Sequence, residues 1–138
     1  MVCNTLLFLH KIVLFTPAIS GSSRVNELST ISLACTVQAN PAPVITWLIR
    51  SEAGVTVLLN SARIDITHQY RVTDYTATSV LTIREAVLSN RGEYVCEVSN
   101  GIPTRTANRD IILVEIEGIT TRIVHCLNAN IPFYVCEL

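Results

Sequence analysis

The most constraining feature of this sequence is the stretch of residues 90–96, which reads Asn-Arg-Gly-Glu-Tyr-Val-Cys. Its first three residues favour a tight corner, because Asn and Gly tolerate the backbone angles of turns. After the corner, Tyr94 and Cys96 share one face of an extended chain, while Val95 and Glu97 share the other. The stretch therefore predicts a β-strand with one buried face.

A second cysteine and the single tryptophan lie upstream at informative distances. Cys35 precedes Cys96 by 61 residues (96 − 35 = 61), Trp47 follows Cys35 by 12 residues (47 − 35 = 12), and Tyr94 stands two residues before Cys96. A Cys, a Trp about a dozen residues later and a second Cys preceded by this Tyr form the pattern of an immunoglobulin sandwich. Over roughly residues 17–116, the sequence resembles the intermediate-set immunoglobulin domains of cell-adhesion molecules and cell-surface receptors.

The resemblance implies an all-β fold, an immunoglobulin-like Greek-key β-sandwich of two antiparallel sheets. It also implies a disulfide between Cys35 and Cys96, with Trp47 packed beside the sulfurs. Leu81 is expected in the same core, and Tyr94 is expected to bury its ring and donate its hydroxyl to a nearby backbone carbonyl.

The length of 138 residues suits one domain of about 100 residues with an extension at each end. We expect residues 1–16 to be a signal peptide or an N-terminal extension, residues 17–116 to be the immunoglobulin-like domain and residues 117–138 to be a C-terminal tail. Ala18 and Ser20 would suit a signal peptidase. No segment approaches the roughly 20 uninterrupted apolar residues of a transmembrane helix, so no membrane span is expected.

Hydrophobic patterning predicts the strands of the domain. They are residues 17–25, 31–38, 45–50, 55–59, 63–66, 70–73, 79–83, 94–99 and 105–116. Between the last two, Asn100 and Gly101 favour a two-residue turn in which both residues take positive φ. The unalternating run 111–114 leaves the buried face of the last strand open.

Two residues depart from the family pattern. Leu28 follows Glu27 where the family commonly has Gly, and Asn90 stands where it commonly has an Asp that pairs with an Arg. Arg71 is therefore expected to keep at most a neutral hydrogen bond to Asn90, which is weaker than a charge-assisted one.

Charge and cysteine content limit the possible partners and compartments. The net charge is −1, Lys11 is the single lysine and the arginines are scattered, so a nucleic-acid surface is not expected. Five cysteines favour an oxidising compartment, and the odd number leaves at least one unpaired or intermolecular. The pairing of Cys3, Cys126 and Cys136 stays open: a Cys126–Cys136 disulfide and a tail with unpaired thiols are both possible.

No catalytic or cofactor site is visible. The histidines have no nucleophile beside them and no Gly-rich phosphate loop occurs. His125, Cys126 and Cys136 fit no zinc-ligand spacing. We therefore expect no enzyme activity, no cofactor, no metal and no small-molecule substrate.

The sequence predicts a candidate partner face on the sheet that holds Trp47. It comprises the outward-facing residues of two strands, Thr46, Leu48, Arg50, Val95 and Glu97. Strand parity turns Leu48 and Val95 toward solvent, and an apolar centre with a polar rim is typical of protein interfaces. The alternative is that chain segments before Ile31 or after Cys126 cover this patch.

Two functions follow. The resemblance implies a non-catalytic, extracellular protein-binding module in cell adhesion or cell-surface recognition, either secreted or part of a cell-surface protein. Its partner would be another protein, homophilic or heterophilic. The alternative is an intracellular scaffold domain like those of muscle filaments, which the absence of an Asn-x-Ser/Thr glycosylation site favours and the extra cysteines oppose.

Overall fold

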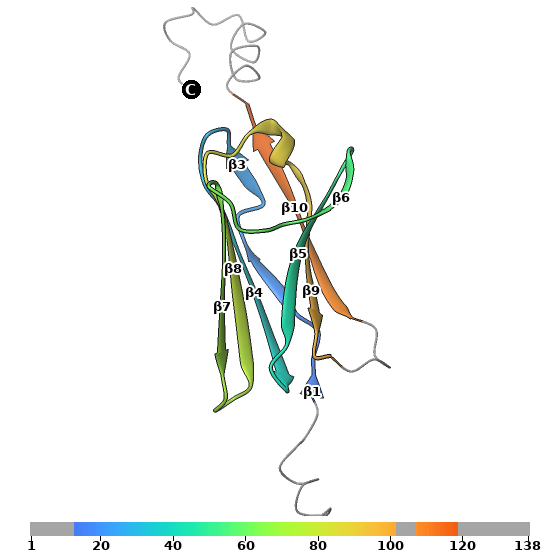
Figure 1. The fold of residues 1–138 in the computed structure, drawn as a ribbon. Coiled ribbons are helices and arrows are strands. Elements are labelled where there is room, and N and C mark those ends of the chain that lie inside the picture. The colour runs from blue at the N-terminus through green and yellow to red at the C-terminus, as the bar shows by residue number, and fades with distance from the viewer. Residues whose placement is uncertain (1–12, 102–106, 119–138) are drawn as a thin grey trace, which may run out of the picture.

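The computed structural model describes residues 13–101 and 107–118, which form two packed β-sheets (Figure 1). The first sheet contains β1 (Val13–Leu14), β2 (Ala18–Gly21), β4 (Ile31–Asn40), β8 (Thr76–Ile83) and β7 (Ile64–Arg71). The second contains, in spatial order, β3 (Arg24–Asn26), β10 (Asn108–Glu117), β9 (Gly92–Ser99), β5 (Val44–Ser51) and β6 (Gly54–Val57). A 3-10 helix, η1 (Leu88–Asn90), precedes β9. The expected all-β sandwich is confirmed, with β3 paired in parallel to β10.

The core forms where the inward rows of the two sheets meet. Cys35 and Cys96 are joined by a disulfide with a Cα–Cα distance of 6.4 Å, and both are fully buried. Trp47 is 1% exposed, and its indole N–H donates a hydrogen bond of 2.9 Å to the hydroxyl of Ser79. Leu81 lies in the same cluster. The pairing and packing that the resemblance implied are therefore present.

The segment expected as one edge strand, residues 17–25, divides between the two sheets. β2 pairs with β4, whereas β3 pairs with β10. Gly21 permits the crossing, because its φ is +142° and an added Cβ would lie 2.4 Å from the carbonyl oxygen of Ser32. The expectation of a single strand is wrong because one glycine lets the chain change sheets.

The expected two-residue turn at Asn100 and Gly101 is also wrong. β9 pairs with β10 so that Val98 faces Asn108, which leaves an eight-residue connection, 100–107. Asn100 does not take positive φ, although Gly101 does, at +76°.

The reason for this register lies in the core. A turn at residues 100–101 would pair residue 98 with residue 103 and so turn Arg109 and Glu115 inward. The observed register instead buries Val114 and Ile116, which are 0% and 8% exposed. It thereby settles which face of the run 111–114 is buried.

Two smaller expectations also change. Residues 63–66 and 70–73 were expected as separate strands, but β7 is continuous. Arg71, the last residue of β7, pairs with Asp74 in the β7–β8 turn at 2.8 Å. The side-chain oxygen of Asn90 instead accepts a hydrogen bond of 2.9 Å from the backbone N–H of Val87. The expected Arg71–Asn90 hydrogen bond is therefore wrong.

Candidate protein-binding face

The register of the second sheet builds one continuous outer face. Residues directly opposite each other in antiparallel strands share a face. One row across the sheet consists of Val57, Leu48, Val95 and Ile111, and the next consists of Val55, Arg50, Glu93 and Leu113. We define the outer strip as the six apolar residues of these rows: Val55, Val57, Leu48, Val95, Ile111 and Leu113.

Most of the outer strip is accessible to solvent. The exposed fractions are 63% for Val55, 50% for Val57, 43% for Ile111 and 52% for Leu113. Large apolar side chains gathered on one sheet face are a feature of interaction sites, whereas single exposed ones need no explanation.

Val95 corrects one expectation from the sequence. Parity places it on the outer face as expected, but it is only 1% exposed, so the expectation that it faces solvent is wrong. Its cross-strand neighbours are Leu48 on β5 and Ile111 on β10. With an apolar side chain on each flank, Val95 forms the floor of the outer strip rather than its contact surface.

Charged residues lie between and beside the apolar residues of the outer strip. Arg50 and Glu93 form an ion pair of 3.9 Å, and Arg109 and Glu97 form one of 2.9 Å. Thr46 lies opposite Glu97 in the row beyond Leu48. The structure thus brings the residues of the expected face together on one surface. Exposed ion pairs contribute only about 0–1 kcal/mol to stability, so their main effect here is to surround apolar residues with charge.

Four residues of the outer strip were missed in the sequence: Val55, Val57, Ile111 and Leu113. The sequence of β10 does indicate that Ile111 and Leu113 face solvent. Arg109 and Glu115 share their parity, and two charged residues on one parity indicate the solvent side.

The sequence left open whether chain segments before Ile31 or after Cys126 cover this face. Strands β1 and β2 pair with β4 in the other sheet, and β3 pairs along β10. These strands extend the sheets at their edges and do not cross the outer strip. Residues 1–12 and the segment after Cys126 lie outside the described residues.

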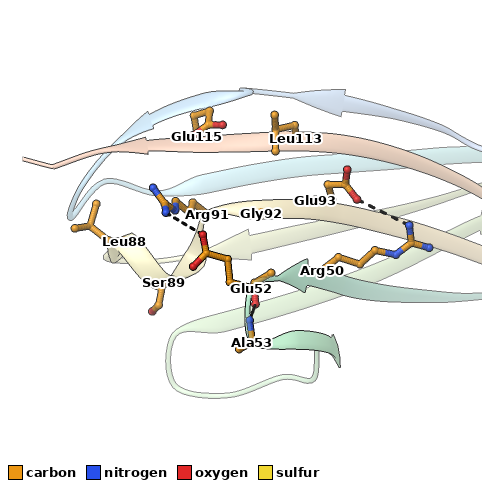
Figure 2. Close-up of a pocket in the computed structure, with 11 residues that line it drawn as sticks. Arg50, Glu52, Ala53, Leu88, Ser89, Arg91, Gly92, Glu93, Leu113 and Glu115 are labelled. Carbon is orange, nitrogen blue, oxygen red and sulfur yellow. Dashed lines mark hydrogen bonds and ion pairs between the residues drawn. The ribbon is translucent and has the colours of Figure 1, made fainter.

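A groove of about 710 Å³ lies at one end of the same face (Figure 2). Its walls are the β5–β6 turn, η1, the start of β9 and the outer row of β10, and Arg91 spans it to pair with Glu52 at 3.6 Å. Gly92 shapes its floor: its φ is +152°, and an added Cβ would lie 2.5 Å from the carbonyl oxygen of Arg50. Only glycine fits this corner without displacing the backbone.

The corner also positions the buried tyrosine. The Tyr94 hydroxyl donates a hydrogen bond of 2.6 Å to the carbonyl oxygen of Asn90. Burial raises the pKa of Tyr94, because the charged form would lose its hydration. The packing role expected for Tyr94 is therefore present.

The other candidate groups do not converge on a site. Within residues 13–101 and 107–118, no group of three or more His, Cys, Asp or Glu side chains could hold a metal ion. In the same ranges, no helix has the length and apolar character needed to cross a membrane. Cys3, His125, Cys126 and Cys136 lie outside the described residues, and His68 is an exposed residue of β7.

Comparisons with known proteins agree with this architecture. Residues 16–100, which are more than half of the chain, match the model of the immunoglobulin domain family, so the chain belongs to that family. Among solved structures, the chain is similar to the full ectodomain (Ig1–Ig3) of mouse nectin-like molecule 4. The TM-score is 0.58 and the identity 17%, and the match covers 78% of this chain and 35% of that one.

At this identity the likeness concerns the fold, and the chain spans about a third of the length of that ectodomain. A comparison with curated proteins found no match.

Proposed function

We propose that this chain is an extracellular, non-catalytic protein-recognition module that binds its partner through the outer strip and the surrounding charged residues. The observation that carries the proposal is the row of apolar residues that crosses four strands of the second sheet, namely Val57, Leu48, Val95 and Ile111. Its occupant is a protein in cell adhesion or cell-surface recognition, either a second copy or a different chain.

Two observations support an extracellular location. Cys35 and Cys96 are joined in a disulfide, and disulfides persist mainly in oxidising compartments. The structural neighbour is an ectodomain with three immunoglobulin domains. The scaffold alternative, in which the two cysteines stay reduced, has less support.

The strand set also supports the proposed intermediate-set subtype within residues 17–116. Variable-type domains add two strands beside the central strands of this sheet, and constant-type domains add none. Here β6 pairs with β5, whereas residues 58–63 form no strand. With one added strand, the strand set is intermediate between those of constant-type and variable-type domains.

The surface can be tested with a pair of substitutions. Leu48→Asp with Ile111→Asp places two carboxylates in the outer strip and leaves the buried Val95 in place. We expect bead aggregation by the immobilised chain, or binding of the coated beads to cultured animal cells, to fall by more than about tenfold, as for loss of central interface residues. Val95→Asp is unsuitable because a buried charge would destabilise the fold.

The matched control adds the same charges to the other sheet. Thr36→Asp with Thr67→Asp alters two exposed residues of β4 and β7, far from the outer strip. We expect this control to bind like the unmodified chain. Equal binding by both double variants, with unchanged melting, would exclude the outer strip as the partner surface.

A further inference from the structure

We propose that the groove at the end of the outer face is an intramolecular docking site for the C-terminal segment, residues 119–138 of this chain. This inference goes beyond the proposed function. The groove shares Leu113, Arg50 and Glu93 with the outer face, so a docked segment covers one end of that surface and leaves Leu48 and Ile111 uncovered.

The chain leaves the sandwich beside the groove. β10 ends at Glu117, and the next residue, Gly118, is buried. A Cβ on Gly118 would lie 3.3 Å from a methyl carbon of Leu88. Leu88 lines the groove and is 48% exposed. The chain therefore leaves the sandwich next to an apolar side chain that is half exposed to solvent.

The sequence of the segment is suited to an apolar surface. Its 20 residues (138 − 118 = 20) are mostly apolar or aromatic. The large ones are Ile119, Ile123, Val124, Leu127, Ile131, Phe133, Tyr134, Val135 and Leu138. Burying such side chains against Leu88 and Leu113 is favourable by roughly 25 cal/mol per Å² of apolar surface. An extended segment of this length reaches about 66 Å, so the whole groove lies within its range.

The charges suggest one specific ion pair and no net attraction, because Arg122 and Glu137 leave the segment with a net charge of 1 − 1 = 0. The groove is lined by two arginines and three glutamates, a net charge of 2 − 3 = −1. Arg50 pairs with Glu93, and Arg91 pairs with Glu52 (Figure 2). Within the described residues, the carboxylate of Glu115 makes no such ion pair.

Arg122 is the only arginine of the segment and follows Gly118 by four residues (122 − 118 = 4). Four residues span at most about 13 Å, and Glu115 lies three residues before Gly118 on β10. If the chain turned back at Gly118, Arg122 would come within reach of Glu115.

Covalent attachment favours this occupant over a second copy of the chain. A segment joined directly to the rim of the groove is present at an effective concentration in the millimolar range for a short connection. A free second copy at micromolar concentration would have to bind far more tightly to compete.

The test is amide hydrogen exchange of the full chain, followed by mass spectrometry of peptides from residues 119–138. We expect the segment to exchange at least about tenfold more slowly than a synthetic peptide of the same sequence, because docking protects its amides. Leu88→Asp should remove this protection. The control Val44→Asp, at an exposed position at the other end of the same sheet, should retain it.

Charge reversal tests the expected pair directly. Glu115→Arg and Arg122→Glu should each increase exchange in the segment, and the combined variant should restore protection. Exchange at the rate of the free peptide in the unmodified chain would overturn the proposal, as would equal protection in the Leu88→Asp and Val44→Asp variants. Protection that grows with protein concentration would identify a second copy as the occupant and also overturn it.

The outcome is separable from that of the proposed function. Neither Leu48 nor Ile111 lines the groove. Loss of partner binding in the Leu48→Asp and Ile111→Asp variant can therefore occur with the segment still protected. Conversely, Leu88→Asp can remove the protection of the segment without altering Leu48 or Ile111.

Discussion

At the scale of single residues, Leu28 shows how a departure from the family pattern acts on stability. Its φ is +68° and its side chain is 62% exposed, while its backbone N–H donates a hydrogen bond of 2.7 Å to the carbonyl oxygen of Ala86. The hydrogen bond fixes the turn, but the left-handed conformation costs a residue with a Cβ about 1–2 kcal/mol. The glycine common at this position in the family has no such cost.

Leu28→Gly should therefore increase the free energy of unfolding. The net gain should be about 0.5–1 kcal/mol, because the relief of strain is partly offset by the greater freedom of glycine in the unfolded chain. The melting temperature should rise by about 2–8 °C. Leu28→Ala is the control, since it removes the exposed side chain but keeps the Cβ. A gain in Leu28→Ala equal to that in Leu28→Gly would refute the strain argument.

At the scale of elements, β2 links the two sheets although it belongs to only one of them. It pairs with β4 along its length, and the backbone N–H of Ile19 donates a hydrogen bond of 2.8 Å to a carboxylate oxygen of Asp110 on β10. Pro17, just before it, is buried. Cleavage after Ser20, the candidate signal-peptidase site, would remove β1 and nearly all of β2.

A chain that starts at Gly21 should therefore be less stable than the full chain. We expect a loss of about 2–4 kcal/mol, from the apolar surface exposed and the hydrogen bond lost at Asp110. Chemical denaturation measures the difference, and a chain that starts at Val13 is the control, because it keeps both strands. Equal stability of the two truncated chains would show that β2 is dispensable.

The elements also show what could be predicted from the sequence. Strands β4 and β8 alternate strictly between buried and less buried residues, and β5 does so from Val44 to Arg50, so their inward faces followed from the pattern. The start of β8 was placed three residues too late, at Ser79. The division of β2 from β3 did not, because it depends on a close approach of Gly21 to Ser32 in another strand. Sequence patterns report the faces of one strand, not its distance from another.

The candidate site was also predicted only in part from the sequence. Parity placed Leu48 and Val95 on the outer face correctly, because it is a local property. The burial of Val95 depends on Leu48 and Ile111 in neighbouring strands, and therefore on the register of β10. That register is set by core packing across the long connection 100–107, which no local turn signal describes.

At the scale of the whole molecule, the second sheet contributes one face to the core and the other face to the candidate binding surface. The inner face of the second sheet carries Cys96 and Trp47, while its outer face carries the outer strip. The disulfide closes a sequence separation of 61 residues and stabilises the fold by about 4 kcal/mol on the chain-entropy model, against a typical total of 5–15 kcal/mol. Loss of this bond would weaken the sheet that presents the outer strip.

The oxidation state of this cysteine pair tests the extracellular account most directly. The protein would be isolated from its native cells with free thiols blocked by N-ethylmaleimide at lysis, and its peptides mapped by mass spectrometry without reduction. We expect peptides containing Cys35 and Cys96 to be joined to each other, as in an oxidising compartment. Recovery of both cysteines in alkylated form would contradict an extracellular recognition module and favour an intracellular scaffold.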